Sequence, residues 1–516
     1  MKNGKWKMKN LFLFILAAMV FALPVLAQKP GVSSDPVRNM NSTQVQTVFS
    51  PNRSPLISMR IQFLTGAVDD PKGKEGLANL TAAMIAQGGS KNLTYDEITE
   101  QFYPMATGFG AQVDKEMTTF VGATHVDNLD KYFGIIRQML LEPGFRAEDF
   151  SRLKQDQINY LKTSLRQGND EELGKERLYN LIYAGHPYEH PNAGLISALE
   201  KITLQDVKDF YAKNYSQANL VLGMSGNFSD KSKQDVQNAF SVLPAGTKTV
   251  RKIPAPKPAA GMKIDIIQRE TRATAISLGF PIDVNRANKD FPALALVASY
   301  LGQHRSSNSY LYQRLREARG LNYGDYAYVE YFPRGMFQFD PDPNLSRQSQ
   351  IFQIWIRPVE PNNAQFALRA ALYEFDKLTK NGMSQETFEA TREFLSKYVN
   401  ILTQTQDSAL GYELDSKYYG IGNFNAYMKD RLAKLTLADV NRAIKAHLAN
   451  QPLRVVMVTK DAENLKNALV SDAASPIKYN SEKPKAVLDE DKIIESYKIA
   501  LKPEDVTITP VEQVFQ

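Results

Sequence analysis

The stretch ISMRIQFLTGAVDDPKGKEGLANLTAAMIAQGG, residues 57–89, carries three successive structural signals. In its first seven residues apolar side chains alternate with polar ones, and this spacing of two predicts a half-buried strand over residues 57–63. A loop rich in Gly, Asp and Lys follows over residues 66–74. Apolar residues then recur at helical spacing until the pair Gly88-Gly89, which is a typical helix end. The stretch therefore predicts a strand, a loop and a helix over about residues 75–87.

Two short motifs indicate that the chain contains a duplicated unit. The sequence ITLQDV, residues 202–207, leads into an apolar run at 220–226, and LTLADV, residues 435–440, leads into another at 453–458. Each motif places a Thr where it can cap a helix, and each apolar run is typical of a buried strand. The second half also opens like the first, with an apolar strand at 275–280. The motifs favour two homologous domains over a chance similarity between two common helix-to-strand junctions.

Composition divides the chain into segments. Residues 244–262 are rich in Pro, Ala, Lys and Gly, which interrupt helices and central strands. We therefore predict that they link a first domain, residues 46–243, to a second domain, residues 263–470. From about residue 471 to residue 516 the chain is rich in charged residues and Pro, and we expect an exposed C-terminal tail.

Helical patterns of apolar residues complete each half. They lie near residues 129–141, 146–165, 291–301, 364–378 and 384–404. No Gly-rich phosphate-binding loop stands between a strand and a helix. The pattern predicts an α+β fold with two homologous domains related by a pseudo-two-fold axis. We expect each domain to be a mixed β-sheet that helices cover on one face.

The N-terminus resembles a secretory leader, and this changes the meaning of the net charge. Four Lys precede an apolar run over residues 11–23, and small residues at Val25 and Ala27 suit a cleavage site before an N-terminal arm at 28–45. The run is shorter than the roughly 20 residues that a spanning helix needs, so we expect no stable membrane anchor. Removing residues 1–27 leaves 58 basic against 56 acidic side chains, so the charge predicts no nucleic-acid partner. We expect an exported, soluble, periplasmic protein.

The chain has no cysteine and five histidines. The lack of cysteine excludes disulfide scaffolds, thiolate zinc sites, cysteine nucleophiles and iron–sulfur clusters. His186 and His190 bracket a Pro-Tyr-Glu sequence, but Pro187 argues against a single helix that would carry both as metal ligands. We interpret them, with the scattered His125, His304 and His447, as surface or core residues.

Residues 66–84, GAVDDPKGKEGLANLTAAM, resemble the zinc-motif segment of the pitrilysin/insulinase family of inverzincin metallopeptidases. Further resemblance lies in Gly185-His186-Pro187-Tyr188, in residues 202–207 and in LREARGLNY, residues 315–323. Such matches recur from about residue 45 to about residue 465, and their order and spacing are specific.

The zinc ligands of that family are missing from this chain. In its H-x-x-E-H motif, two His hold zinc and the Glu activates the metal-bound water. Asn79, Ala82 and Ala83 stand at these three positions, and residues 152–161, where the family has its third ligand, contain no Glu. We therefore expect neither a metal site nor any other cofactor in this chain.

The second half keeps a pair that the resemblance makes functional. Arg316 and Tyr323 match the Arg and Tyr that the second homologous domain of this family contributes to the active site. Gly320 between them is a natural helix stop, and we expect an aromatic strand from Tyr323 to Phe332. A tyrosine hydroxyl can stabilise an oxyanion, and a guanidinium can hold substrate carbonyls or carboxylates. The alternative is a surface arginine and a core aromatic.

The resemblance implies the zinc-free Arg/Tyr subunit of the two-chain, processing-peptidase-like branch. We expect a heterodimer in which a homologous H-x-x-E-H subunit holds zinc and this chain supplies Arg316 and Tyr323 for cleavage of unstructured peptides. The chain would be inactive alone. A second hypothesis is a non-catalytic peptide-binding or assembly paralogue, and a third, a peptidase that is active alone, requires a zinc site that we do not find. Some relatives have a Gly-rich loop at residues 302–309. We expect a surface turn between two helices there, and the alternative is a segment that contacts substrate.

Overall fold

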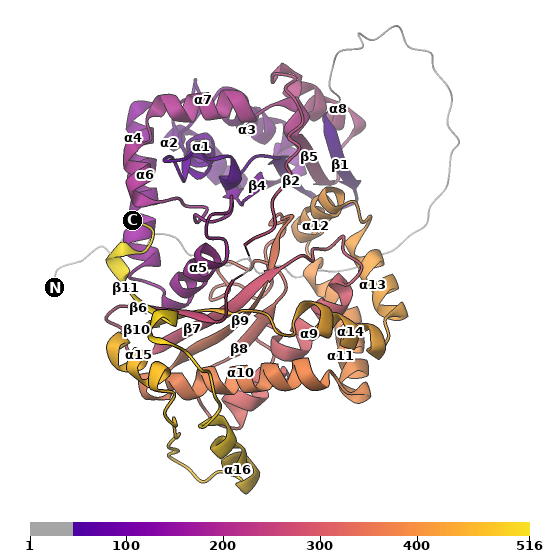
Figure 1. Ribbon diagram of the computed structural model, residues 1–516. Coiled ribbons are helices and arrows are strands. Elements are labelled where there is room, and N and C mark those ends of the chain that lie inside the picture. The colour runs from indigo at the N-terminus through magenta and orange to yellow at the C-terminus, as the bar shows by residue number, and fades with distance from the viewer. Residues whose placement is uncertain (1–44, 258) are drawn as a thin grey trace, which may run out of the picture. The chain divides into compact units, whose positions relative to one another are not determined.

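The computed structural model describes residues 45–257 and 259–516 (Figure 1). The predicted leader, residues 1–27, lies outside these residues, as does all of the predicted arm except residue 45. Within the described part, no helix is long and apolar enough to cross a membrane.

The first half contains a five-stranded mixed sheet. Its strands are β1 (Gln46–Pro51), β2 (Leu56–Phe63), β3 (Gly108–Val113), β4 (Thr118–His125) and β5 (Leu220–Gly226). Their order across the sheet is β1-β5-β2-β4-β3, with β1 parallel to β5 and every other pair antiparallel. Strand β3 therefore forms one edge of the sheet.

The second half repeats this arrangement. Its strands are β6 (Lys263–Gln268), β7 (Thr274–Ile282), β8 (Asp325–Tyr328), β9 (Gln350–Val359), β10 (Arg454–Thr459) and β11 (Val506–Pro510). The order is β11-β6-β10-β7-β9-β8, with β6 and β10 parallel and β10, β7, β9 and β8 successively antiparallel. Without β11, the order matches that of the first sheet strand for strand, which confirms the predicted α+β fold with two homologous domains.

Helices flank both sheets. Those of the first half are α1 (Leu77–Gln87), α2 (Tyr95–Phe102), α3 (Leu129–Leu141), α4 (Ala147–Asn159), α5 (Asp170–Ile182), α6 (Ile196–Lys201), α7 (Leu204–Asn214) and α8 (Asp230–Ala239). Those of the second half are α9 (Phe291–Gly302), α10 (Ala364–Asn381), α11 (Gln385–Leu402), α12 (Gln406–Tyr419), α13 (Phe424–Lys434), α14 (Leu437–His447), α15 (Ala462–Ser471) and α16 (Lys485–Ile494). Short π-helical turns cover Tyr160–Leu165 and Tyr312–Glu317.

The duplicated motifs form equivalent capped helices. Thr203 begins α7 and Thr436 begins α14, and each hydroxyl accepts a hydrogen bond from the backbone N–H three residues on. An Asp at that position returns a bond to the Thr backbone, which completes a capping box in both helices. The two motifs therefore have the same local structure, as the duplication predicts.

One helix of each half packs against the sheet of the other half. Helix α5 contacts β7 and β10 of the second sheet, and α12 contacts β5 and β2 of the first (Figure 1). Glycines allow the close approach: a Cβ at Gly174 of α5 would lie 3.3 Å from the Ser277 hydroxyl, and one at Gly223 of β5 would lie 3.2 Å from Leu414. This exchange joins the two cores, and local sequence patterns gave no sign of it.

The C-terminal segment is not an exposed tail, so this expectation is corrected. Strand β11 pairs in parallel with β6 at the edge of the second sheet. Beyond it, Val511, Val514 and Phe515 are buried in the core of the first half, and the Ile196 N–H donates to the Phe515 carbonyl. The segment docks through apolar side chains that are spaced among charged ones. Burial of these side chains is favourable, although the composition of the segment as a whole is polar.

Candidate functional site

A cleft of about 960 Å³ opens beside the edge strand β3. Helix α1 lines it with Asn79 and Ala83, and α4 lines it with Asp156 and Gln157. The loop after β8 contributes further lining residues, among them Arg334. The cleft thus lies where the zinc-motif helix, the third-ligand helix and a sheet edge meet, and the loop of the second half borders it.

The residues at the motif positions do not fit a zinc ion. Ala82 is buried and has no ligand atom, Ala83 has none either, and Asn79 offers a single neutral amide. Among residues 45–257 and 259–516, no group of three His, Cys, Asp or Glu side chains is placed to hold a metal. A site with fewer than three such ligands does not match protein zinc sites.

Gln157 faces the start of α1 from the third-ligand helix. Its side-chain amide donates to the carbonyl oxygens of Gly76, at 3.0 Å, and Ala193, at 2.8 Å. The side chain is 6% exposed. These bonds tie α4 to the helix start, where the buried Asp70 carboxylate accepts the N–H groups of Gly76 and Ala78 at 2.7 Å. The helix begins at Leu77 rather than near residue 75, because Gly76 has a positive φ of 105°.

The structure brings the two predicted catalytic residues together. The Arg316 guanidinium lies over the Tyr323 ring, 5.3 Å from its centre. Gly320 has the positive φ of 70° that a helix stop requires, and its N–H donates to the Arg316 carbonyl. The Tyr323 side chain is 77% exposed, and neither residue lines the cleft of this chain.

A buried carboxamide that sequence reasoning missed fixes the corner carrying Tyr323. The Asn322 amide donates to the Gly324 carbonyl at 3.2 Å, to the Asp325 carboxylate at 2.7 Å and to the Arg357 carbonyl at 3.2 Å. Gly324 has a φ of 157°, so the strand begins only at Asp325. The predicted strand from Tyr323 to Phe332 was therefore too long. The only available signal was an Asn two residues before a Gly in a turn.

Comparison with known proteins identifies the family. Residues 47–206 match the family model described as Insulinase (Peptidase family M16), and residues 201–395 match the one described as Peptidase M16 inactive domain. This chain belongs to the M16 family.

Two curated proteins of Helicobacter pylori are similar to this M16 protein. One, named Non-peptidase homolog YmxG, is 21% identical over 441 residues, which are 82% of this chain and 93% of that protein. The other, named Zinc protease PqqE, is 22% identical over 282 residues, which are 52% of this chain and 60% of that protein. The crystal structure of a peptidase M16 inactive domain from Pseudomonas fluorescens has the same fold, with a TM-score of 0.69 and 23% identity over 81% of this chain and 96% of that one.

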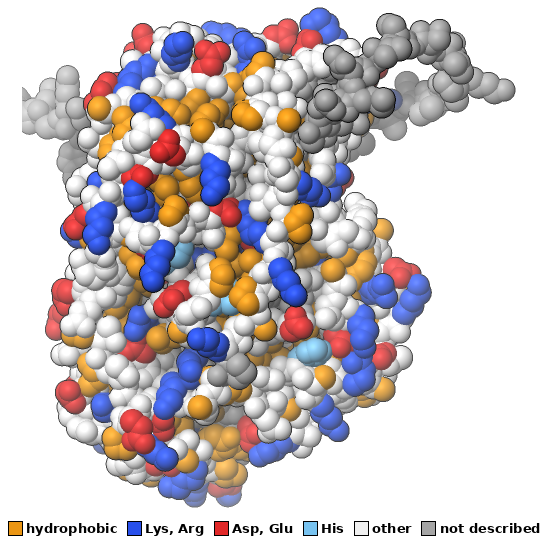
Figure 2. All heavy atoms as spheres, turned by 45° about the horizontal axis from the view of Figure 1, so that its top comes forward, with side chains coloured by type: hydrophobic (Ala, Val, Ile, Leu, Met, Phe, Trp, Pro, Cys, Tyr) orange, Lys and Arg blue, Asp and Glu red, His pale blue; other side chains and the backbone are white. Residues whose placement is uncertain are grey.

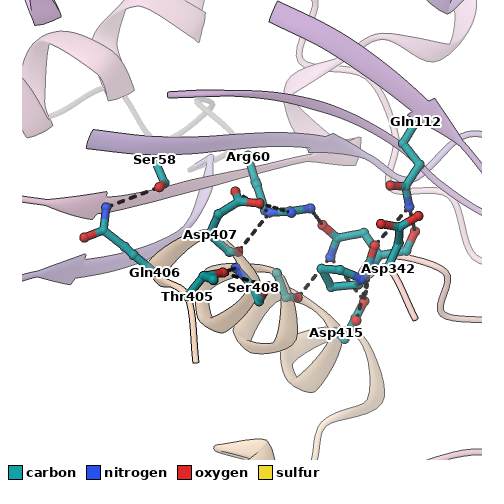
Figure 3. A network of polar contacts seen from close by, with 12 residues as sticks. Ser58, Arg60, Gln112, Asp342, Thr405, Gln406, Asp407, Ser408 and Asp415 are labelled. Atoms are coloured by element: carbon teal, nitrogen blue, oxygen red, sulfur yellow. Dashed lines mark hydrogen bonds and ion pairs between the residues drawn. The ribbon is translucent and has the colours of Figure 1, made fainter. Parts of the chain in front are cut away.

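A polar network joins the two halves of the M16 protein next to the cleft (Figure 3). Arg60 of β2 donates from Nε to the Asp407 carboxylate at 3.0 Å and from Nη1 to the Asn344 side-chain oxygen at 2.8 Å. Gln112 of β3 donates to the Pro343 carbonyl at 2.9 Å. The loop between β8 and β9 is thereby fastened to the edge of the first sheet.

His186 and His304 make structural contacts in the M16 protein. The His186 ring bonds the Pro254 carbonyl through Nε2 and accepts the Tyr188 N–H through Nδ1. His304 is 7% exposed and contacts the Tyr328 hydroxyl and the Gln338 carbonyl, so residues 302–309 are not merely a surface turn.

On the face that Figure 2 draws, Lys and Arg side chains are interspersed with Asp and Glu, and no large patch of a single charge sign forms.

Proposed function

We propose that this chain is the zinc-free subunit of a two-chain, exported M16 metallopeptidase that degrades or processes unstructured peptides. A homologous H-x-x-E-H subunit would hold the zinc, and this chain would contribute Arg316 and Tyr323. One observation carries the proposal: the two side chains stack on each other at the surface, outside the cleft of their own chain. Groups so placed are accessible to atoms of another molecule.

The chemistry of the pair suits peptide cleavage. Tyr323 is 77% exposed in the free chain, and its hydroxyl can donate to an oxyanion once a partner encloses it. The Arg316 guanidinium can donate in a fork to a substrate carbonyl or carboxylate. Stacking of the two groups fixes the ring relative to the guanidinium, which lowers the entropy cost of presenting both at once.

The comparisons and the N-terminal sequence support this proposal. Helicobacter pylori has both a non-peptidase homolog and a zinc protease that are similar to this chain, as a zinc-free and a zinc-bearing subunit would be. Residues 1–27 have the charge and apolar pattern of a leader for export, and the proposed site of action is the periplasm.

Reconstitution tests the proposal. The mature chain would be mixed with an H-x-x-E-H paralogue from the same genome, and cleavage of an unstructured fluorogenic peptide would be measured. We expect activity only in the mixture, and a loss of about 100-fold in kcat for Tyr323→Phe or Arg316→Ala, as for removal of one oxyanion donor.

A matched pair elsewhere provides the control. The Arg431 guanidinium lies over the Tyr427 ring of α13, 5.4 Å from its centre. Arg431→Ala and Tyr427→Phe should leave the mixed activity unchanged. Two results would refute the proposal: full activity of the paralogue alone, or mixtures with the Arg316→Ala or Tyr323→Phe variant that are as active as the mixture with the parent chain.

A second candidate function is peptide binding or complex assembly without catalysis. It is favoured by the cleft, which keeps an accessible sheet edge at β3 although the metal positions beside it are Asn79 and Ala83. An extended peptide can add to such an edge as a further strand. In that case the mixture would form a complex, or the chain would bind peptide, with no dependence of cleavage on Arg316 or Tyr323.

A further inference from the structure

Helix α16 of the C-terminal segment is bound by side chains to the turn that carries Arg316. This turn, Tyr312–Glu317, is π-helical, and the Ala318 N–H donates to the Gln313 carbonyl at 3.0 Å, five residues back. Such turns are rare and occur frequently at functional sites. The contacts that fix the turn therefore also fix the place of Arg316.

Arg319 joins the end of the turn to α16. Its guanidinium donates from Nε to the Asp491 carboxylate at 2.8 Å, from Nη2 to Glu490 at 2.8 Å and from Nη1 to the Arg314 carbonyl at 2.7 Å. Arg319 is 3% exposed and Asp491 is 5% exposed. One planar guanidinium thus ties two acids of α16 to the backbone of the turn, with directions that its fork of donors fixes.

Arg314 binds the same turn to α10 and α16. Its Nε donates to the Glu374 carboxylate of α10 at 2.7 Å, and its guanidinium also pairs with Glu490. Lys377 of α10 pairs with Glu374 at 3.0 Å and with Glu490 at 3.4 Å. With Arg319, the cluster contains three cations and three carboxylates, so its charges balance. We call this cluster the α16 clamp.

The clamp leaves Arg316 free to stack on Tyr323. Arg316 lies between two arginines that are bound to carboxylates, and its own guanidinium lies over the Tyr323 ring. Tyrosine hydroxyls occupy the second oxygens of two clamp carboxylates, at 2.7 Å in each case (Tyr310 on Glu374 and Tyr479 on Asp491). These acids are therefore already engaged and do not compete with Tyr323 for the Arg316 guanidinium.

We propose that α16 is a positioning element for the Arg316 and Tyr323 pair. Glu490 and Asp491 hold the turn, through Arg314 and Arg319, in the conformation that stacks the two side chains. Both acids act through other residues, so they are positioning residues. A pair that is held in place before a substrate arrives loses less entropy on binding it. The effect on catalysis rests on the proposed function, whereas the stacking is a property of this chain alone.

Fluorine NMR on the mature chain alone, with fluorotyrosine in place of Tyr323, tests the stacking. The variant Arg316→Ala defines the spectrum of the unstacked ring. We expect the double variant Glu490→Gln/Asp491→Asn to move the parent resonance most of the way to that of Arg316→Ala. The control Asp489→Asn changes an exposed acid on the same helix, paired with Lys485, and should keep the parent spectrum.

Kinetics of the reconstituted enzyme test the effect on catalysis. The same double variant should lower kcat about tenfold and leave KM within about twofold, because a misplaced pair loses contacts to the transition state. Arg319→Lys keeps the positive charge without the fork of donors, and it serves if the double variant fails to fold. It should give a smaller loss in kcat, about threefold, and an intermediate fluorine resonance.

The two measurements separate this inference from the proposed function. A mixture that is inactive with the parent chain would refute the proposed function, and the spectrum would still decide on the clamp. A parent spectrum in Glu490→Gln/Asp491→Asn and Arg319→Lys would overturn the inference. The parent kcat in active mixtures with these variants would overturn it as well.

Discussion

At the scale of single residues, metal binding by this M16 protein depends on which side chains stand at the zinc-motif positions. The backbone around the zinc motif is intact: Asp70 caps α1, and Gln157 braces α4 against it. What the motif lacks is its side chains: Asn79 and Ala83 stand at the His positions, Ala82 stands at the Glu position, and residues 152–161 contain no Glu. These positions therefore offer no zinc-ligand set, although the helices that carry them are tied together.

Restoring ligands should restore metal binding. The combined substitutions Asn79→His, Ala83→His and Gln157→Glu supply two imidazoles at helical spacing of four and a carboxylate on the facing helix. We expect near-stoichiometric zinc in the purified variant and none in the parent, by elemental analysis after dialysis. The control variant carries the same two His substitutions with Gln155→Glu in place of Gln157→Glu. Gln155 lies on the exposed side of α4. Equal zinc in both variants would show that Gln157 does not face the motif helix.

Asn322 should act on catalysis through Tyr323. Asn322→Ala removes three hydrogen bonds that hold the turn, so the Tyr323 ring would sample several positions. In the reconstituted enzyme we expect kcat to fall about tenfold with KM nearly unchanged, because only the transition-state contact is lost. Asn400→Ala, on an exposed face of α11, should leave both constants as in the parent. A rise in KM alone would indicate a structural role.

His304 should make stability depend on pH. Burial of the ring lowers the His304 pKa to about 4, although the bond with the Gln338 carbonyl raises it. The unfolded value is about 6.5, so its stabilising contribution is complete above that pH and is lost as pH falls toward 4. Urea titrations should show that the unfolding free energy falls less in His304→Gln than in the parent as the pH is lowered over this window. The difference should be about 2 kcal/mol. Part of the pH dependence should remain in this variant, because the pKa of His190 is also lowered to about 4.

At the scale of elements, the last strand and the two exchanged helices hold the fold together. Strand β11 covers the edge of β6, which would otherwise present unpaired N–H and C=O groups. The chain then crosses to the first half, where the Arg166 guanidinium donates to the Val514 carbonyl at 2.6 Å. The C-terminus thus ties the second sheet to the first core.

Truncating one docked side chain should test this tie. Phe515→Ala removes a ring that is 4% exposed, and we expect a loss of about 3 kcal/mol in unfolding free energy. Glu512→Ala, in the same segment but exposed, should change stability by less than about 0.5 kcal/mol. Thermal and urea unfolding measure both. Equal stability of the two variants would show that the segment is not docked in solution.

At the scale of the whole molecule, a buried ion pair joins the halves. Arg347, from the loop before β9, donates from Nε to the Asp114 carboxylate at 2.8 Å across 233 residues of sequence, and both side chains are almost completely buried. Burial of the two charges carries a desolvation cost, so the pair adds little net stability. Its main effect is to specify how the two halves are arranged.

A double-mutant cycle should separate these effects. Arg347→Met leaves Asp114 buried and unpaired, and we expect a loss of about 3–5 kcal/mol. The double variant Arg347→Met/Asp114→Leu should recover most of that loss, because no unpaired charge remains. The exposed pair Lys397 and Glu393 serves as a control, with coupling below about 1 kcal/mol. Additive losses at the buried pair would contradict direct coupling between the halves.

The sequence alone determined the strands and helices, the duplication, and the absence of the zinc ligands. Periodicity and capping residues are local properties, so β2, α9 and the capping boxes of α7 and α14 followed from short windows. The corner around Gly320 also followed, because a positive φ favours glycine.

Only the tertiary structure decided which surfaces meet. The exchange of α5 and α12, the docking of Phe515, the Arg347–Asp114 pair and the orphaned oxygen of Gln157 all depend on contacts between segments distant in sequence. A buried charge or an unsatisfied amide has no local signature, since its energy depends on what surrounds it. For that reason the missing zinc ligands could be recognised in the sequence, whereas these long-range contacts appeared only in the fold.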